Sequence, residues 1–149
     1  MNKGGALKQA WYWVLSRFFR RLADAHRHFG NLYGNRDEQW AAIGNYTRAV
    51  ELDPGYAQAY FSRGVLYWRE VGHPDRAVQD LTRTLEIDSS WAEAYFNRAM
   101  AYQGRHEDEA AIADLERYLV EGQDEYWLES ARRQLVELRA ETGSHEAGV

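Results

Sequence analysis

Hydrophobic and small residues recur at helical spacing along most of this chain. Tyr60, Gly64 and Tyr67 are separated by four and three residues, which places them on one face of an α-helix. The pattern breaks at the sequence GHPD, a combination of glycine and proline that is typical of a turn. It then resumes on a second helical face formed by Ala77, Leu81 and Leu85. This part of the chain is therefore predicted to form two helices joined by a short turn.

The same pattern occurs three times. Gly30, Gly64 and Ala99 occupy equivalent positions that are 34 and 35 residues apart. A tyrosine follows three residues after each of them, and a helical second half follows that tyrosine: Tyr33, Ala42 and Tyr46; Tyr67, Ala77 and Leu81; Tyr102, Ala111 and Leu115. A fixed period of this length predicts an array of repeated helical hairpins. The three copies span residues 23–56, 57–91 and 92–125.

Two features of the repeats predict specific contacts. Glycine in a helix interior costs about 1 kcal/mol relative to alanine, so Gly30 and Gly64 indicate a close approach of two helix backbones. Arg63 precedes Asp80 by 17 residues and Arg98 precedes Asp114 by 16, whereas the first copy has neither an arginine nor an aspartate at these positions. Because the arginine and the aspartate occur together or not at all, we expect an ion pair within each of the last two hairpins.

An additional helix is predicted at the carboxyl end. Residues 126–141 place Trp127, Ala131, Leu135 and Leu138 on one face, and charged residues cover the other. A stack of repeats needs a terminal helix with a polar outer surface. We therefore expect residues 126–141 to cap the array and residues 142–149 to form a flexible tail.

The first 22 residues are predicted to form an amphipathic helix with more aromatic residues than a single apolar stripe requires. Two interpretations remain open. The helix is either a cap that packs on the first hairpin, or an anchor that attaches the chain to a membrane surface, to a partner protein or to a second copy. Aromatic residues beside cations are typical of an interfacial helix. The candidate anchor residues are Trp11, Trp13, Arg17, Phe18, Phe19, Arg20 and Arg21.

Charge distinguishes this amino-terminal region from the rest of the chain. Residues 1–36 carry seven Lys or Arg and one Asp, a net charge of +6, whereas residues 37–149 carry 11 basic and 22 acidic residues, a net charge of −11. The acidic body makes nucleic acid an improbable partner, because phosphate contacts require a basic face. The basic end favours an anionic membrane or an acidic partner.

The repeated pattern resembles the tetratricopeptide repeat (TPR). The period of about 34 residues and the order of aromatic, Gly or Ala, Tyr, Ala and Leu positions carry the resemblance, over about 100 of the 149 residues. The chain departs from the family at His26, where a tryptophan is usual, and at Arg63 and Arg98, where a leucine is usual. The resemblance implies an all-α fold, a right-handed superhelical array of helical hairpins.

The resemblance also implies a function. TPR domains bind partner peptides in a concave groove lined by the first helix of each repeat, so the chain is expected to be a non-catalytic adaptor or scaffold for a protein or peptide partner. The groove positions carried over from the family are Arg27, Asn31, Phe61, Val65, Trp68, Arg69, Phe96, Asn97 and Met100.

Some TPR domains hold the carboxyl-terminal tail of a chaperone with a set of Lys, Asn and Arg side chains. In this chain Arg27 and Asn31 match the first pair. Ser62 replaces the next asparagine, while Glu93 and Asn97 stand where the last two cations would be. Loss of both cations removes most charge-assisted hydrogen bonds to a carboxylate, so a chaperone tail is not the expected partner.

Other chemistry finds little support in the sequence. No cysteine is present, and His26 and His28 are two residues apart, so they point to different sides of a helix and do not form a metal pair. We expect no metal, no cofactor and no catalytic site. The segment WYWVLSRFF is far shorter than the roughly 20 apolar residues of a membrane span. The expected location is cytoplasmic, or peripheral at the cytoplasmic face of a membrane.

Overall fold

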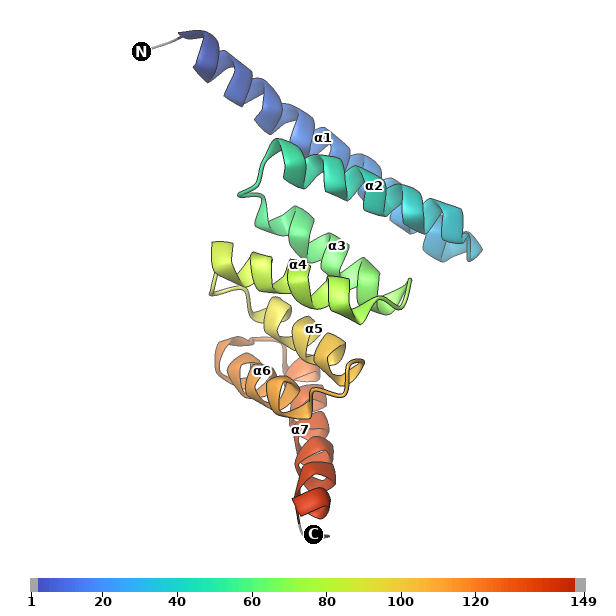
Figure 1. Cartoon of the computed structure of the whole chain (residues 1–149), viewed down its shortest axis with the longest axis vertical. Coiled ribbons are helices and arrows are strands. Elements are labelled where there is room, and N and C mark those ends of the chain that lie inside the picture. Colours follow the sequence, from blue (N-terminus) through green and yellow to red (C-terminus); the bar gives the residue numbers. More distant parts are fainter. Residues whose placement is uncertain (1–2, 147–149) are drawn as a thin grey trace.

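A computed structural model describes residues 3–146 as seven α-helices, with no strand in that range. The helices are stacked one after another along the long axis of the molecule, from α1 at one end to α7 at the other (Figure 1). They are α1 (Lys3–Tyr33), α2 (Arg36–Leu52), α3 (Ala57–Arg69), α4 (Pro74–Ile87), α5 (Ala92–Gln103), α6 (Asp108–Glu121) and α7 (Glu125–Glu146). The predicted all-α array of helical hairpins is confirmed.

Three hairpins form the body of the array. The most extensive contacts join α1 to α2, α3 to α4, and α5 to α6, and each hairpin then packs on the next. Each connection within a hairpin contains one residue with a positive φ: Gly34 (61°), Gly72 (72°) and His106 (59°). The Asn35 side chain accepts a 2.9 Å hydrogen bond from the Asp37 amide and caps the start of α2.

In the first two hairpins, the two helices lie close together at the predicted glycines. A Cβ atom at Gly64 would lie 2.9 Å from the Leu81 side chain on α4, and one at Gly30 would lie 2.9 Å from the Gln39 side chain on α2. Both distances are shorter than van der Waals contact. The predicted close approach is confirmed, and it explains why two helix interiors tolerate a residue that weakens helices.

The predicted ion pairs are also confirmed. Arg63 donates two hydrogen bonds of 2.7 Å to the carboxylate of Asp80, and Arg98 donates bonds of 2.7 and 2.8 Å to Asp114. The third nitrogen of Arg63 reaches back to the preceding hairpin, where it donates a 2.8 Å bond to the Thr47 hydroxyl. Burial raises the pKa of Asp80, and the neighbouring Arg63 offsets only part of that shift. Each arginine therefore links a hairpin internally and to its predecessor.

The ends of the array differ from the expected boundaries. The predicted division at residue 22 lies inside α1, which runs without interruption into the first hairpin because no proline or glycine interrupts residues 6–29. At the other end, residues 142–146 continue α7 and do not form the expected tail. The remaining part of that tail, residues 147–149, lies outside the described residues.

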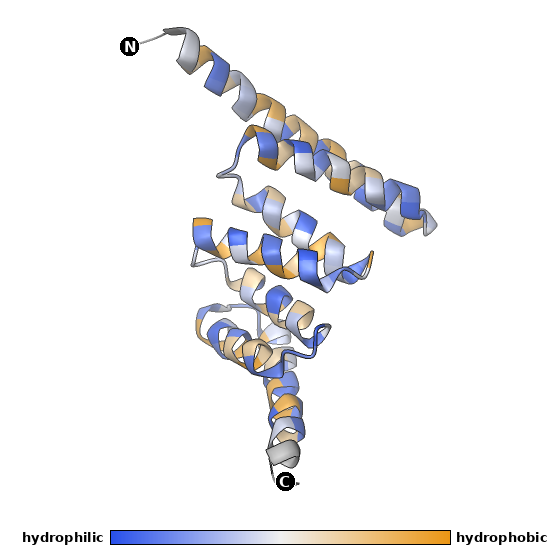
Figure 2. Ribbon diagram, in the orientation of Figure 1, coloured by the Kyte–Doolittle hydropathy of each residue, from blue (hydrophilic) through white to orange (hydrophobic). Residues whose placement is uncertain are grey.

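The core follows the hairpins, and exposed apolar side chains gather on α1. Side chains such as Tyr46, Leu66, Leu81 and Leu115 are fully buried between the helices. Figure 2 shows that hydrophobic residues also occur along the part of α1 that projects beyond α2. Within residues 3–146, no helix combines the length and the apolar composition needed to cross a membrane.

Candidate functional site

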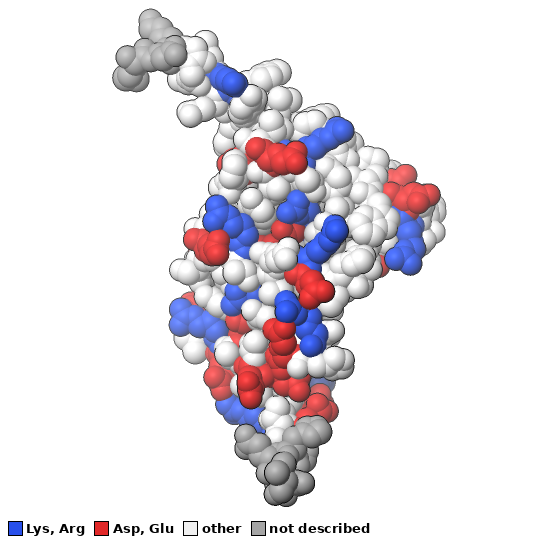
Figure 3. All heavy atoms as spheres, viewed as in Figure 1, with Lys and Arg blue, Asp and Glu red and all other residues white. Residues whose placement is uncertain are grey.

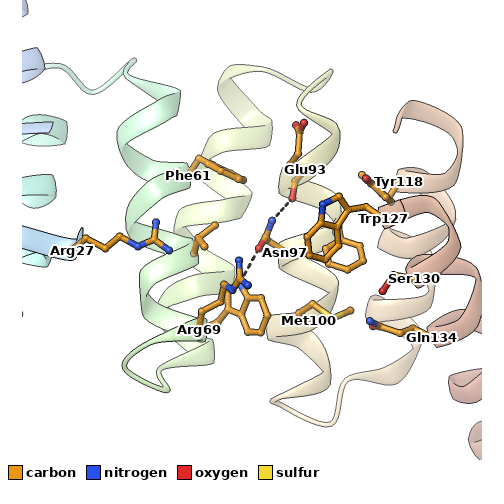
Figure 4. A pocket seen from close by; sticks show the side chains of 13 residues that line it. Arg27, Phe61, Arg69, Glu93, Asn97, Met100, Tyr118, Trp127, Ser130 and Gln134 are labelled. Atoms are coloured by element: carbon orange, nitrogen blue, oxygen red, sulfur yellow. Dashed lines mark hydrogen bonds between the residues drawn. The ribbon is translucent and has the colours of Figure 1, made fainter. Parts of the chain in front are cut away.

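One side of the array is hollowed between α3, α5 and α7, and the hollow is bounded on the α1 side by Arg27 (Figure 4). Its volume is about 390 Å³. We call this hollow the groove. Its lining residues are Arg27, Phe61, Val65, Trp68, Arg69, Glu93, Phe96, Asn97, Met100, Tyr118, Trp127, Ser130 and Gln134.

Eight of the nine groove positions carried over from the family line this one hollow. They come from α1, α3 and α5, which are the first helices of the three hairpins. The exception is Asn31, which lies outside the lining and donates a 3.4 Å hydrogen bond to Glu70. Residues separated by up to 73 positions in the chain are thus brought together because each hairpin contributes the same face of its first helix.

The apolar walls of the groove are held by aromatic packing. The Phe61 ring stacks on Trp91, with ring centroids 5.1 Å apart. The centroid of the Phe96 ring lies 5.3 Å from the ring centroids of both Tyr118 and Trp127, and the Phe96 side chain is buried. Because these rings are supported from behind, the groove presents a shaped apolar surface before any ligand binds. Such preformed apolar hollows with a few polar groups are typical of binding sites.

A short chain of hydrogen bonds crosses the floor of the groove. The Trp68 indole donates a 3.1 Å bond from Nε1 to Oδ1 of Asn97, and Nδ2 of Asn97 donates a 2.7 Å bond to the backbone oxygen of Glu93. These bonds fix the amide orientation of Asn97 and the position of the Trp68 ring. Arg69 lies over that ring, with its guanidinium carbon 5.6 Å from the centroid.

The two ends of the groove differ in their electrostatics. Arg27 donates bonds of 2.6 and 3.2 Å to Glu70, so its positive charge is neutralised within the chain. At the opposite end, Glu93 is exposed and forms no ion pair in residues 3–146. Burial raises the pKa of the nearby Tyr118, and the carboxylates of Glu93 and Asp124 raise it further. The end of the groove near α7 is therefore acidic.

Sequence reasoning missed the wall that α7 contributes. Trp127, Ser130 and Gln134 complete the groove, with Tyr118 from α6 behind them. The sequence contained a signal for these three α7 residues, because each follows a groove residue of α5 by 34 positions. Trp127 follows Glu93, Ser130 follows Phe96, and Gln134 follows Met100. The capping helix thus continues the groove register of the repeats, although it starts no fourth hairpin.

The candidate anchor residues divide into two groups. Phe19 packs in a core cluster with Val50 and Ala59. Arg17 forms an ion pair with Asp53, and Arg20 bonds Asp24 at 2.6 Å. The other four remain at the surface of α1: Trp11, Trp13, Phe18 and Arg21.

The part of the chain that the structure describes contains no group of three His, Asp or Glu side chains arranged to hold a metal ion. His26 instead lies beside α2, where its Nδ1 is 2.6 Å from a carboxylate oxygen of Glu38. This pair belongs to the packing of the first hairpin and is not part of the groove.

Comparison with known proteins supports the repeat assignment. A family model described as "TPR repeat" matches residues 30–70. A search of curated proteins finds no match.

Solved structures match a much larger part of the chain. The TPR domain of Arabidopsis OM64 matches with a TM-score of 0.74 and 23% sequence identity, covering 87% of this chain and 98% of that domain. The first TPR of Spaghetti (RPAP3), bound to the HSP90 peptide SRMEEVD, matches with a TM-score of 0.68 and 22% identity, covering 83% and 95%. The second TPR domain of human RPAP3, in complex with the HSP70 peptide SGPTIEEVD, matches with a TM-score of 0.66 and 20% sequence identity. The match covers 83% of this chain and 98% of that domain.

These comparisons and the hairpin geometry confirm the tetratricopeptide resemblance. Residues 30–70 match the TPR repeat, and the described residues have the fold of a TPR solenoid. Two of these structures, both of RPAP3 domains, contain a bound HSP90 or HSP70 peptide.

Proposed function

We propose that this protein is a non-catalytic adaptor that binds an apolar segment of a partner protein in the groove. The main support for this proposal is that apolar side chains from α3, α5 and α7 line one hollow. They are Phe61, Val65, Trp68, Met100 and Trp127. Aromatic and methionine side chains are enriched at the centre of protein interfaces, and tryptophan is among the residues that contribute most of the binding energy there. The half-buried Met100 adapts to partners of different shape.

The charges of the groove favour a partner of different chemistry from the acidic peptides SRMEEVD and SGPTIEEVD that are bound by the two RPAP3 domains. Arg27 forms an ion pair with Glu70, so its guanidinium is not available to a ligand carboxylate. Glu93 adds a negative charge to the opposite end. An acidic peptide would be repelled by this carboxylate, and Arg69, which lies over the Trp68 ring, would be the one lining cation without an ion pair in residues 3–146 that could offset the repulsion. We therefore expect the partner segment to combine an apolar centre with a basic residue that approaches Glu93.

The experiment is a screen followed by a binding measurement. Partner segments are captured from an unbiased peptide display library on the wild-type protein, synthesised, and titrated by calorimetry. A single groove of this size is expected to bind with a dissociation constant in the micromolar range, about −8 kcal/mol. Loss of at least about tenfold in affinity is expected for Met100→Lys and for Trp68→Ala, because each removes an apolar contact at the centre of the groove.

The control is a pair of substitutions outside the groove. Val120 and Val136 are 76% and 69% exposed and line no part of it. The variants Val120→Lys and Val136→Lys should bind like the wild type. Circular dichroism at the assay temperature establishes that every variant is folded. Equal affinity of Met100→Lys, Trp68→Ala and the controls for every captured segment would place the binding surface elsewhere.

A further inference from the structure

The projecting helix α1 carries most of the exposed large hydrophobic side chains of residues 3–146. In the described part of the chain, nine of the fourteen exposed large hydrophobic side chains belong to this helix. Exposed apolar residues scattered singly are normal, but a contiguous group on one element indicates an interaction surface. The nine residues are Leu7, Trp11, Tyr12, Trp13, Val14, Phe18, Phe29, Leu32 and Tyr33.

The spacing of six of these nine residues places them on one side of the helix. Leu7, Trp11, Val14 and Phe18 are separated by four, three and four residues, so they share one side of the helix. The exposed Ala25 continues the same side toward the last two turns of α1. We call the set Leu7, Trp11, Val14, Phe18, Ala25, Phe29 and Leu32 the outer stripe.

The outer stripe faces away from the rest of the protein. Ser16, Ala23 and Gly30 are buried and recur every seven residues on the opposite side of α1, which is the side that packs on α2. Because α1 has 31 residues and α2 has 17, the first turns of α1 extend beyond its partner (Figure 1). As α1 is the end helix of the described stack, an extended surface can reach the whole stripe without contacting another helix.

The charges beside the stripe are positive. Lys8 and Arg21 are exposed and form no ion pair within residues 3–146. In the view of Figure 3, the projecting part of α1 shows a basic side chain and no acidic one, whereas acidic side chains gather toward α6 and α7. The only carboxylate in residues 1–36 is Asp24, which already accepts hydrogen bonds from Arg20 and Tyr46.

We infer that α1 binds an anionic lipid surface through the outer stripe. Apolar side chains would enter the interface between headgroups and acyl chains, while Lys8 and Arg21 would meet the lipid phosphates. The net charge of −11 on residues 37–149 would be repelled by the same surface, which orients the groove away from the membrane. A second copy of the chain fits less well, because two α1 helices would juxtapose their cations without a carboxylate to pair them.

Vesicle flotation tests this inference with the full-length protein. Vesicles of phosphatidylcholine alone are compared with vesicles that contain about one third phosphatidylserine, at low and high salt. The wild type is expected to float with the anionic vesicles and to be released by high salt, since screening weakens surface charge contacts. The variant Trp11→Glu/Phe18→Glu, at two positions that are 61% and 57% exposed, should lose at least about tenfold in partitioning.

Two further variants separate the contributions. Lys8→Glu/Arg21→Glu retains the stripe and should lose binding to the anionic vesicles by a similar factor. Val120→Glu/Val136→Glu adds the same negative charge at exposed apolar positions far from α1, and should float like the wild type. The inference would be overturned if the wild type did not float, or if the control lost as much binding as the stripe variant. It would equally be overturned if light scattering showed a stable dimer that Trp11→Glu/Phe18→Glu converts to monomers.

Discussion

Arg63 on α3 and Asp80 on α4 are joined by two hydrogen bonds of 2.7 Å. The arrangement recurs one repeat later between Arg98 and Asp114. Both aspartates are buried, with relative exposures of 6%. The two arginines also link each hairpin to the preceding one, because each donates a hydrogen bond to a threonine hydroxyl there.

The ion pair predicts an asymmetric mutational response. Arg63→Met should lower the free energy of unfolding by about 3 kcal/mol, because it leaves the buried carboxylate of Asp80 without its partner. The double variant Arg63→Met/Asp80→Leu should recover most of that loss, since no buried charge remains. Urea unfolding followed by circular dichroism measures both. A double variant as unstable as the single one would show that the pair contributes more than charge compensation.

The close approach at Gly64 predicts opposite effects for two glycine substitutions. Gly64→Ala should destabilise the protein by about 1–3 kcal/mol, because the new Cβ atom would overlap the Leu81 side chain. Gly44 provides the matched control, since it lies within α2 and has no atom within 4 Å of an added Cβ. Gly44→Ala should stabilise the protein by about 0.5–1 kcal/mol. Thermal unfolding of the two variants would disprove the assigned packing if both gained stability.

Tyr46 predicts a dependence of stability on alkaline pH. Burial raises the pKa of Tyr46 above its ordinary value of 10.0, and its hydrogen bond to Asp24 raises it further. The unfolded chain therefore loses this proton at lower pH than the native state. The stability contribution is complete below about pH 10 and decreases as the pH rises above it. Compared with Tyr46→Phe, the free energy of unfolding of the wild type should fall more steeply between about pH 10 and 12.

Groove charge predicts how affinity for an acidic peptide can be changed. The peptide SRMEEVD should bind the wild type weakly, because Glu93 repels it and Glu70 neutralises Arg27. Glu93→Lys should increase the affinity roughly tenfold or more, since a lysine there can donate charge-assisted hydrogen bonds. Glu137→Lys makes the same change of charge at an exposed position outside the groove. Fluorescence polarisation should separate the two variants; an equal gain in both would indicate only a net-charge effect.

Much of the fold could be predicted because the same residue pattern recurs in each of the three hairpins. The recurrence of Gly30, Gly64 and Ala99 identified the hairpins. The joint occurrence of arginine and aspartate identified two ion pairs that the structure contains. The continuity of α1 was not predicted, because the family pattern suggested a boundary that no helix-breaking residue supports.

The groove was only partly predictable, because the repeat pattern that defines its positions on α3 and α5 does not determine which face of α7 completes it. Positions on α3 and α5 followed from the repeat register, and the structure brings them together. The Trp127 side chain was assigned to the packing face of α7, whereas it lies against Phe96 at the edge of the groove. Which face of a capping helix turns toward a neighbour depends on how the last hairpin ends, and residues 122–124 carry no repeat pattern that determines it.

The central claim is that a partner segment binds in the groove, and the tryptophan indoles provide the most direct measurement. Trp68 and Trp127 line the groove, Trp11 and Trp13 lie exposed on α1, and Trp40 is exposed at the start of the array. A segment selected by the display screen is added to ¹⁵N-labelled protein, and the indole N–H resonances are followed by NMR. The account predicts that the resonances of Trp68 and Trp127 shift, while those of Trp11, Trp13 and Trp40 do not. Shifts confined to Trp11 and Trp13 would contradict it.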